Sequence, residues 1–285
     1  MAVYKRGYEP YEGRLTPEWS RFLIIARQAY RRVFESRFLI AFFVVCTIYP
    51  LVCAGAIYLP YNAALETFLE GRKLFPIDGA FFTKFLAWQA GTLAFLLTGF
   101  LGPGLVSPDL ANNGLPLYFC RPFSRAEYVL GKMAVLAILL SAITWVPGLL
   151  LFGFKGYLAG FGWLIDNWRI AAGVFIGSWA WIVTLSFLAL AMSAWVKWRI
   201  AAGALIFGIV FVAAGFGQAF NQALRTKAGY AVNLVAIIET IWRSMFGDSD
   251  LKMPAAQAWV SLAAFCGLCY FLLAKKLRAY HVERS

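Results

Sequence analysis

The sequence predicts an all-α fold, that of a polytopic membrane protein with six transmembrane helices. Of its 285 residues, 61% are hydrophobic and only 14% are charged, whereas soluble domains average about 45–50% apolar and about 25% charged residues. The apolar residues gather into six runs without Asp, Glu, Lys or Arg, each at least 20 residues long. About 20 such residues cross the hydrocarbon layer as a helix, and helices satisfy their own backbone groups in lipid.

The six runs divide the chain into three parts. The predicted spans cover residues 38–59, 85–106, 133–154, 170–196, 200–220 and 255–274. They form one transmembrane domain, residues 38–274, between an N-terminal segment (1–37) and a short tail (275–285). A seventh apolar stretch, 228–242, is too short to cross the membrane and contains Glu239. We therefore expect it to form a re-entrant or interfacial helix on the outer side, before the last span.

Basic residues are distributed unevenly among the segments that connect the runs. If both termini are cytoplasmic, 17 of the 26 lysines and arginines lie on the cytoplasmic side, while the 14 acidic residues divide equally. This is the positive-inside pattern, so the net charge of +12 needs no nucleic-acid partner. The sequence thus predicts a multi-pass protein of the cell inner (cytoplasmic) membrane with both termini cytoplasmic.

The segment before the first span predicts an amphipathic helix. Thr16-Pro-Glu18 is a typical helix start, with a capping hydroxyl, proline at the first helical position and an acid in the first turn. Apolar residues then recur at helical spacing, and basic residues occupy the other face. The apolar face holds Trp19, Phe22, Leu23, Ala26, Tyr30, Val33 and Phe34. We expect an elbow helix that lies flat in the cytoplasmic interface, against the lipid bilayer.

The connection between the second and third spans carries three capping signals. Ser107-Pro-Asp has the cap, proline and acid of a new helix start, and Asn112-Asn-Gly is a typical stop. Ser124 and Glu127 then have the spacing of a capping box, which would begin the third span. The connection is therefore predicted to be a short helix held between two breaks at the cytoplasmic surface.

Small residues occur at the spacing that lets helices approach closely. Gly173 and Gly177 have this spacing in the fourth span, and Ala204, Gly208 and Gly215 lie in the fifth. Packing within one chain explains such residues, and so does an interface with a second membrane subunit. The sequence leaves both explanations open.

Motifs for catalysis and nucleotide binding are not found in the sequence. Gly131-Lys132 lacks the upstream glycine and the following hydroxyl of a phosphate-binding loop. The single histidine, His281, lies in the tail, and the spans contain no titratable relay of the kind that ion-coupled transporters use. We expect a chain that is not an enzyme and holds no metal or cofactor. Two alternatives stay open, namely a membrane enzyme acting on lipid and an anchor or assembly subunit that moves no substrate.

The connection after the second span resembles that of a known family. Asp109 is followed by Gly114, by Pro122-Phe-Ser-Arg125 and by Gly131-Lys132. This order is similar to the ABC-2 type permease family, the membrane subunits of ATP-binding-cassette exporters. Gly114 is followed by Leu-Pro here, where the family usually has Thr-Leu. The segment 233–247 is also similar to the outer helix that precedes the family's last span.

The resemblance implies a division of labour between subunits. Two permease subunits, the same or related chains, would pair and bind two cytoplasmic ATPase subunits, which would hold the ATP and the Mg²⁺. The short helix near residues 107–113 would be the coupling helix. The residues that the resemblance assigns to ATPase coupling are Ser107, Asp109, Asn112, Asn113, Arg121, Ser124, Arg125 and Glu127. Ala204, Gly208 and Gly215 are the candidates for the interface between the two permeases.

Overall fold

The computed structural model describes residues 20, 26–30, 34–62, 76–112, 114 and 124–282. Within these residues the chain has helices and no strand, and six of its helical stretches are long and apolar enough to cross a membrane. The prediction of an all-α polytopic protein is confirmed. The elements in chain order are α2 (Arg37–Tyr58), η2 (Leu59–Tyr61), α4 (Gly79–Leu86), η3 (Ala87–Ala94), α5 (Phe95–Leu101), α6 (Pro103–Ala111), α8 (Arg125–Ile143), α9 (Trp145–Ala159), α10 (Phe161–Asp166), α11 (Trp168–Trp195), α12 (Arg199–Leu224), η4 (Ala228–Ala231), α13 (Leu234–Met245) and α14 (Ala255–Val282).

The second and third spans are much longer than their charge-free runs. The second is helical from Gly79 to Ala111 and the third from Arg125 to Ala159. The runs stopped early because charged residues lie near the ends of these helices: Lys84 and Asp109 in the second, Lys132 and Lys155 in the third. A lysine near a helix end extends its ammonium to the membrane surface or to a partner while its methylenes remain among apolar groups. A run that ends at the first charge therefore underestimates the helix.

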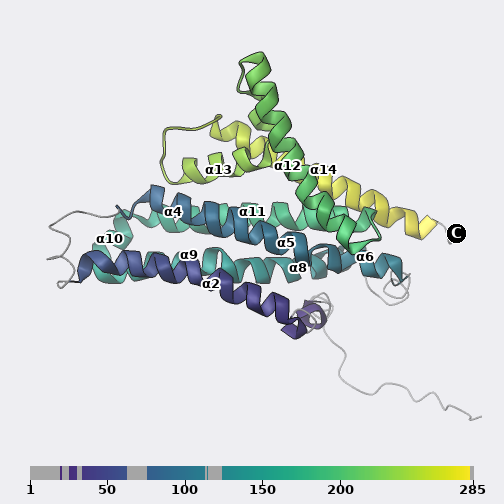
Figure 1. Cartoon of the computed structure of the whole chain (residues 1–285), viewed down its shortest axis with the longest axis horizontal. Coiled ribbons are helices and arrows are strands. Elements are labelled where there is room, and N and C mark those ends of the chain that lie inside the picture. Colours follow the sequence, from purple (N-terminus) through teal and green to yellow (C-terminus); the bar gives the residue numbers. More distant parts are fainter. Residues whose placement is uncertain are drawn as a thin grey trace, which may run out of the picture.

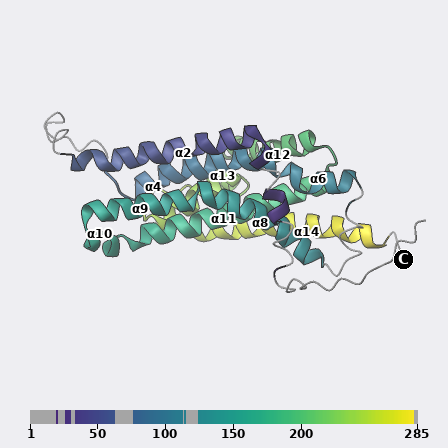
Figure 2. The ribbon, with the colours of Figure 1, turned by 90° about the horizontal axis from the view of Figure 1, so that it is seen from below.

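Most of the bundle is organised around α11. This helix contacts α6, α8, α9, α12, α13 and α14, and Figures 1 and 2 both show it running through the middle of the molecule. We call one end of the bundle the base: α2 begins there, α6 ends, α8 begins, α11 gives way to α12, and α14 ends (Figure 1). The opposite end holds α10 and the start of α4.

The second span contains a π-helical segment, η3, that is joined to two neighbouring helices. Pro50 in α2 has no N–H, so the carbonyl of Cys46, four residues earlier, loses its helical donor. Gln89 Nε2 of η3 donates to this carbonyl at 2.8 Å. On the other side, Trp181 Nε1 of α11 donates to the carbonyl of Ala90 at 2.7 Å. These buried hydrogen bonds satisfy backbone groups that the proline and the irregular helix would otherwise leave in an apolar interior.

The predicted short helix before the last span is α13. It begins at Leu234, where Asn233 Oδ1 accepts from Ala236 N at 3.1 Å, rather than at residue 228. Its 12 residues measure about 18 Å, too short for a layer of about 30 Å. The helix packs against α4, α11, α12 and α14. The charge of Glu239 is compensated within the chain, because its carboxylate pairs with Arg243 at 2.9 Å and with Lys252 at 2.6 Å.

The small residues of the fourth span make room for α13 inside the same chain. A Cβ on Gly177 would lie 2.6 Å from Trp242 Cδ1, and one on Gly173 would lie 2.8 Å from Phe246 Cε1. Trp242 Nε1 also donates to the carbonyl of Gly177 at 3.1 Å. For these two glycines, packing within one chain is the explanation that the structure shows.

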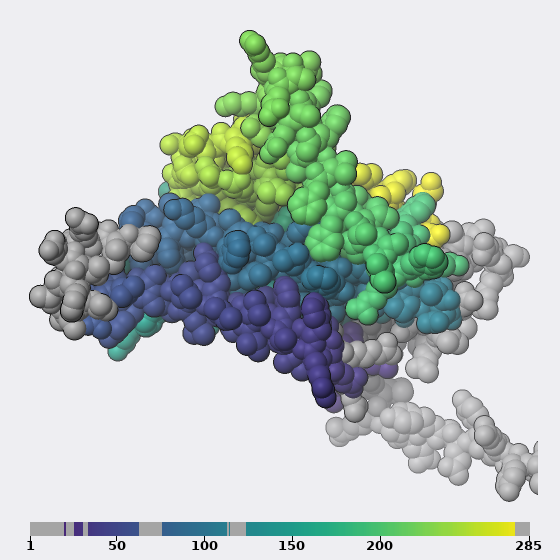
Figure 3. Space-filling view, viewed as in Figure 1, coloured from purple at the N-terminus to yellow at the C-terminus, as the bar shows by residue number. Residues whose placement is uncertain are grey.

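Helix α12 leaves the bundle obliquely. It starts at the base and projects from the body of the molecule, as Figures 1 and 3 show. It ends at Leu224, and the next residue, Arg225, has a φ of 49° in the left-handed region, which reverses the chain. The returning segment then packs closely on α12, since a Cβ on Gly217 would lie 2.5 Å from the carbonyl oxygen of Gly229.

Part of the predicted elbow helix lies within the described residues. Residues 26–30 are helical, with Ala26 buried and Arg27 and Gln28 exposed. Tyr30 Oη lies within hydrogen-bond distance of the carbonyls of Ala134 and Val135 on α8, at 3.1 and 3.2 Å. Burial raises the pKa of the Tyr30 hydroxyl, which keeps it a neutral donor. The predicted helix start at Thr16-Pro-Glu18 lies outside the described residues.

Candidate functional site

The base of the bundle brings together most of the residues expected to couple to a partner. Helix α6 carries Ser107 and Asp109 and ends at Asn112, while α8 carries Arg125 and Glu127 after its cap Ser124. Asn113 and Arg121 lie outside the described residues, as do all residues from 115 to 123. The structure therefore describes both helix ends to which this segment is attached, the end of α6 and the start of α8. One of the expected local structures is wrong and two are confirmed.

Ser107 does not begin a helix. Helix α6 starts four residues earlier at Pro103, directly after Gly102, so Ser107 lies within it. Its side chain is fully buried, and its Oγ is 2.7 Å from the carbonyl of Val196 at the end of α11. The prediction failed because Gly102-Pro103 offers the same signal, a proline at the first helical position. The Ser107 hydroxyl is used for a tertiary contact instead.

Asp109 is held within the chain by two neighbours on α8. Its Oδ2 lies 2.8 Å from Lys132 Nζ and accepts a hydrogen bond from Tyr128 Oη at 2.7 Å. The two charged side chains are 17% and 9% exposed, and the ammonium lies 5.4 Å from the centre of the Tyr128 ring. Asp109 is near the C-terminal end of α6, where the helix dipole disfavours an anion. Lys132 supplies the compensating charge.

The stop after α6 forms where the sequence predicts it. Asn112 N donates to the carbonyl of Pro108 at 3.0 Å, and Gly114 N donates to that of Asp109 at 2.7 Å. These bonds satisfy carbonyls that have no partner in a helix end. The chain therefore leaves α6 in a fixed direction at the base.

The capping box at the start of α8 is confirmed. Ser124 Oγ accepts from Glu127 N at 3.2 Å, and Glu127 Oε2 accepts from Ser124 N at 2.6 Å. This reciprocal pair fixes the direction in which the chain enters the third span. The segment 112–124 thus departs from one fixed helix end and returns to another.

Three residues of this site were not predicted as site residues from the sequence: Tyr128, Lys132 and Ser193. Tyr128 and Lys132 are four residues apart, so they share one face of α8. Ser193 lies in an apolar run, where a hydroxyl needs a partner, and that is the signal that points to it. Neither signal identifies the partner, because Asp109 and the carbonyls of α6 come from another helix.

The expected subunit-interface residues on α12 have no partner among the residues that the structure describes. Ala204 and Gly215 are exposed and Gly208 is half-buried. A Cβ on Gly208 or Gly215 would meet no atom within 4 Å. Large apolar side chains continue this face, among them Phe211, 66% exposed, and Val212, 70% exposed. The chain itself offers no use for these glycines.

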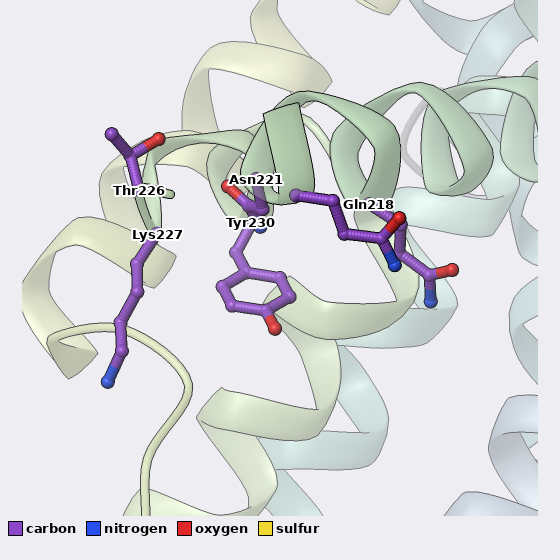
Figure 4. Close-up of a pocket in the computed structure, with 6 residues that line it drawn as sticks. Gln218, Asn221, Thr226, Lys227 and Tyr230 are labelled. Atoms are coloured by element: carbon purple, nitrogen blue, oxygen red, sulfur yellow. The ribbon is translucent and has the colours of Figure 1, made fainter. Parts of the chain in front are cut away.

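An open polar pocket lies beside the far part of α12, at the chain reversal (Figure 4). Its volume is about 450 Å³, and its lining is Gln218, Asn221, Gln222, Thr226, Lys227 and Tyr230. Asn221 Oδ1 is already used, because it accepts from Gly229 N at 2.7 Å. The lining has amides, hydroxyls and one ammonium but no pair that could act as acid and base. Elsewhere in the described chain, no three His, Cys, Asp or Glu side chains come together to hold a metal ion.

The chain matches no protein-family model, and no curated protein matches it. What it can do is therefore inferred from its residues and their geometry. A function for this chain has to account for two features. These are the six helices suited to a membrane, and the segment 112–124 that is attached to two fixed helix ends.

Proposed function

We propose that this chain is the permease subunit of an ATP-binding-cassette exporter of the ABC-2 type. It exports a substrate across the cell inner membrane by alternating access, driven by ATP hydrolysis in separate subunits. The observation that carries the proposal is the mounting of the segment 112–124. Both of its ends are fixed by caps and by the buried Asp109–Lys132 pair, as a segment that transmits force to the spans requires.

The proposal places the base in the cytoplasm. Lys197, Arg199, Lys275 and Lys276 lie there, at the α11–α12 link and near the end of α14. Basic residues favour the cytoplasmic side of a membrane protein. Lys276 also lies 5.4 Å from the ring centre of Trp195, an aromatic residue of the kind that gathers at membrane surfaces.

The partner at the base is a pair of ATPase subunits, which hold the ATP and the Mg²⁺. The segment 112–124 docks on them, with the exposed Asn112 at its start and Ser124, Arg125 and Glu127 at its end. Asp109 acts indirectly, because its carboxylate is occupied by Lys132 and Tyr128. It fixes the mount of the segment and is not itself a docking residue.

The second partner is another permease subunit, the same or a related chain, at the face of α12. The support is the row Ala204, Gly208 and Gly215, which has open space around it. Small residues at this spacing let two helices approach until their backbones nearly touch. Lipid alone would not require glycine at positions 208 and 215.

An anchor or assembly subunit is the second candidate, since a mounted segment also serves simple recruitment. The two functions differ in whether nucleotide changes the spans. In an exporter, the accessibility of cysteines placed along α11 changes when ATP is added to the complex with its ATPase. In an anchor, it stays the same.

Co-purification from the native membrane tests the proposed function. The tagged chain is expected to bring down a P-loop ATPase in equal stoichiometry, and the complex is expected to hydrolyse ATP. Replacement of the exposed Asn112 by Trp should weaken this association without changing the folding of the chain. Replacement of Tyr157, 84% exposed and at the opposite end of the bundle, by Ala should leave it intact. A chain that purifies without any ATPase from its native membrane would contradict the proposal.

A further inference from the structure

The Ser193 hydroxyl of α11 is built into the backbone of α6. Its Oγ accepts from Val106 N at 3.1 Å and from Ser107 N at 2.8 Å, and it donates to the carbonyl of Pro103 at 3.0 Å. A hydroxyl has one donor and two acceptor positions, so all three are used. Ser193 is fully buried, and its hydroxyl bridges the carbonyl of Pro103 and the N–H of Ser107, four residues later.

The contact is reciprocal, because Ser107 of α6 serves the end of α11. Its Oγ lies 3.0 Å from the carbonyl of Ser193 and 2.7 Å from that of Val196. The last carbonyls of a helix have no donor within it. Ser107 therefore caps α11 from another helix, and each of the two serines completes the hydrogen bonding of the other's backbone.

The same helix α6 is joined to α8 two residues further along. Asp109 meets Lys132 at 2.8 Å and Tyr128 at 2.7 Å. Ser107 and Asp109 are thus the points at which α6 is fastened to the end of α11 and to the first turns of α8. Ser193, Tyr128 and Lys132 are all buried, so water does not compete for these contacts.

The neighbouring helix α12 contacts the second span mainly through apolar groups, among them Phe207, whose ring packs against Phe95 and Phe100. It follows α11 after the short link of Val196, Lys197 and Trp198. The polar contact from its start to the second span is Arg199 Nη2 to the carbonyl of Phe100, at 3.4 Å and exposed. Apolar packing is non-directional, so α12 can shift along the second span more readily than α6, which side-chain hydrogen bonds join to α11.

We propose that α6, the start of α8 and the end of α11 move as one rigid body, and that Ser193 is the positioning residue that makes them one. This inference rests on the proposed function. A displacement imposed on the segment 112–124 reaches the central helix α11 directly. Without Ser193, α6 would lose three of its hydrogen bonds to α11 beside Pro103, whose missing N–H already weakens the helix there. The displacement would then be absorbed at this point, so ATP binding would no longer move α11.

Cross-linking tests whether the two serines stay together throughout the cycle. The chain carries Ser107→Cys and Ser193→Cys, with its five native cysteines replaced by alanine. The serine Oγ atoms are 3.0 Å apart, and a disulfide requires such closely placed side chains. In the complex with its ATPase, the oxidised pair should keep the ATP turnover of the cysteine-free chain that retains both serines, and reduction, which breaks the tether without restoring the Ser193 hydroxyl, should lower it. Turnover that is lost on oxidation and restored by reduction would overturn the inference.

Substitution of Ser193 alone tests its role as a positioning residue. Ser193→Ala should retain the bound ATPase but lose the nucleotide-dependent change in accessibility of cysteines on α11. Ser193→Thr, which keeps the hydroxyl, should restore the change. The matched control is Ser178→Ala on the same helix, because the Ser178 hydroxyl is buried without a partner. If Ser193→Ala and Ser178→Ala behave alike, Ser193 positions nothing.

Spin labels give a readout that does not depend on the cysteine pair forming a disulfide. Labels at Asn112 and Lys197, both exposed at the base, should keep one distance with and without ATP. Labels at Asn112 and Phe216, 60% exposed on α12, should change theirs. Absence of any ATPase binding would remove the proposed function. Binding with a changing Asn112–Lys197 distance would remove this inference alone.

Discussion

The base of the bundle and the projecting helix α12 differ in whether their distinctive residues have partners within the chain. At the base, the polar side chains Ser107, Asp109, Lys132 and Ser193 are buried or nearly so, and each is paired with another group of the same chain. On α12, the residues Ala204, Gly208 and Gly215 have the spacing of a helix interface, but a Cβ on either glycine would meet no atom of the described residues within 4 Å.

This difference separates what the chain does for itself from what it offers to others. Paired polar groups inside a membrane bundle hold helices together, because an unpaired group there is costly. Small residues facing open space do not stabilise the chain that carries them. We therefore assign the buried polar groups of the base to internal rigidity, and we propose that the face of α12 contacts a second permease subunit. The following substitutions test that contrast.

Lys132→Met is expected to have the largest effect. It leaves the Asp109 carboxylate, whose side chain is 17% exposed, without its charge partner, and removing one partner of a buried ion pair costs about 3–5 kcal/mol. Unfolding in detergent micelles by denaturant or heat measures the loss. The double variant Asp109→Leu/Lys132→Met should recover most of the stability, since it removes both charges. A double variant no more stable than Lys132→Met would show that the pair is not the cause.

Ser193→Ala follows, with an expected loss of about 2–4 kcal/mol. Two buried N–H groups, those of Val106 and Ser107, lose their acceptor, and each such loss costs about 1–3 kcal/mol. The matched control on α11 is Ser186→Ala, because the buried Ser186 hydroxyl has no partner to lose. Equal unfolding free energies for the two variants would contradict the account of the base.

The two glycines Gly177 and Gly208 give the most direct contrast between inside and outside. Gly177→Val places its Cβ 2.6 Å from Trp242 Cδ1, and such overpacking costs about 1–3 kcal/mol. A Cβ on Gly208 meets no atom of the described residues within 4 Å, so Gly208→Val should leave the stability of the monomer unchanged. It should instead weaken self-association, or association with the related permease, measured by light scattering or cross-linking in micelles. A destabilised Gly208→Val monomer with unaltered association would reverse the assignment of α12.

Ser124→Ala is expected to have the smallest effect, a loss of about 1 kcal/mol. It removes the acceptor for Glu127 N at the start of α8, and loss of such a cap typically costs about that much. The change is local, so α11 should be unaffected. Hydrogen exchange should increase at the first turn of α8 and not in α11, and a spread to α11 would mean that the cap does more than the geometry indicates.

The features predicted from the sequence are those that depend on neighbouring residues. Hydropathy predicts the six spans, because lipid imposes length and composition on each helix separately. The capping box of Ser124 and Glu127 is correct because both partners lie within one turn. The helix start at Ser107 is wrong because Gly102-Pro103 competes with it locally, and a hydrogen bond to α11 uses the serine.

The features that the sequence did not predict depend on residues far apart in the chain. Asp109 and Lys132 belong to different helices, and so do Ser107 and Ser193. The residues next to a lone polar residue in an apolar helix do not indicate which residue of another helix will be its partner. The same holds for Gln89, whose partner is a carbonyl that Pro50 in another helix leaves without its helical donor. The oblique direction of α12 likewise follows from packing and not from its own sequence.

Site-specific photo-cross-linking tests most directly the claim that the base docks an ATPase. A photoreactive amino acid is placed at Asn112, exposed at the start of the connecting segment, and in a matched variant at Tyr157, exposed at the opposite end. The cross-link is made in native membranes. The account predicts a covalent adduct with a P-loop ATPase from position 112 and none from position 157. An ATPase adduct from position 157, or none from position 112 although the chain is folded and inserted, would contradict it.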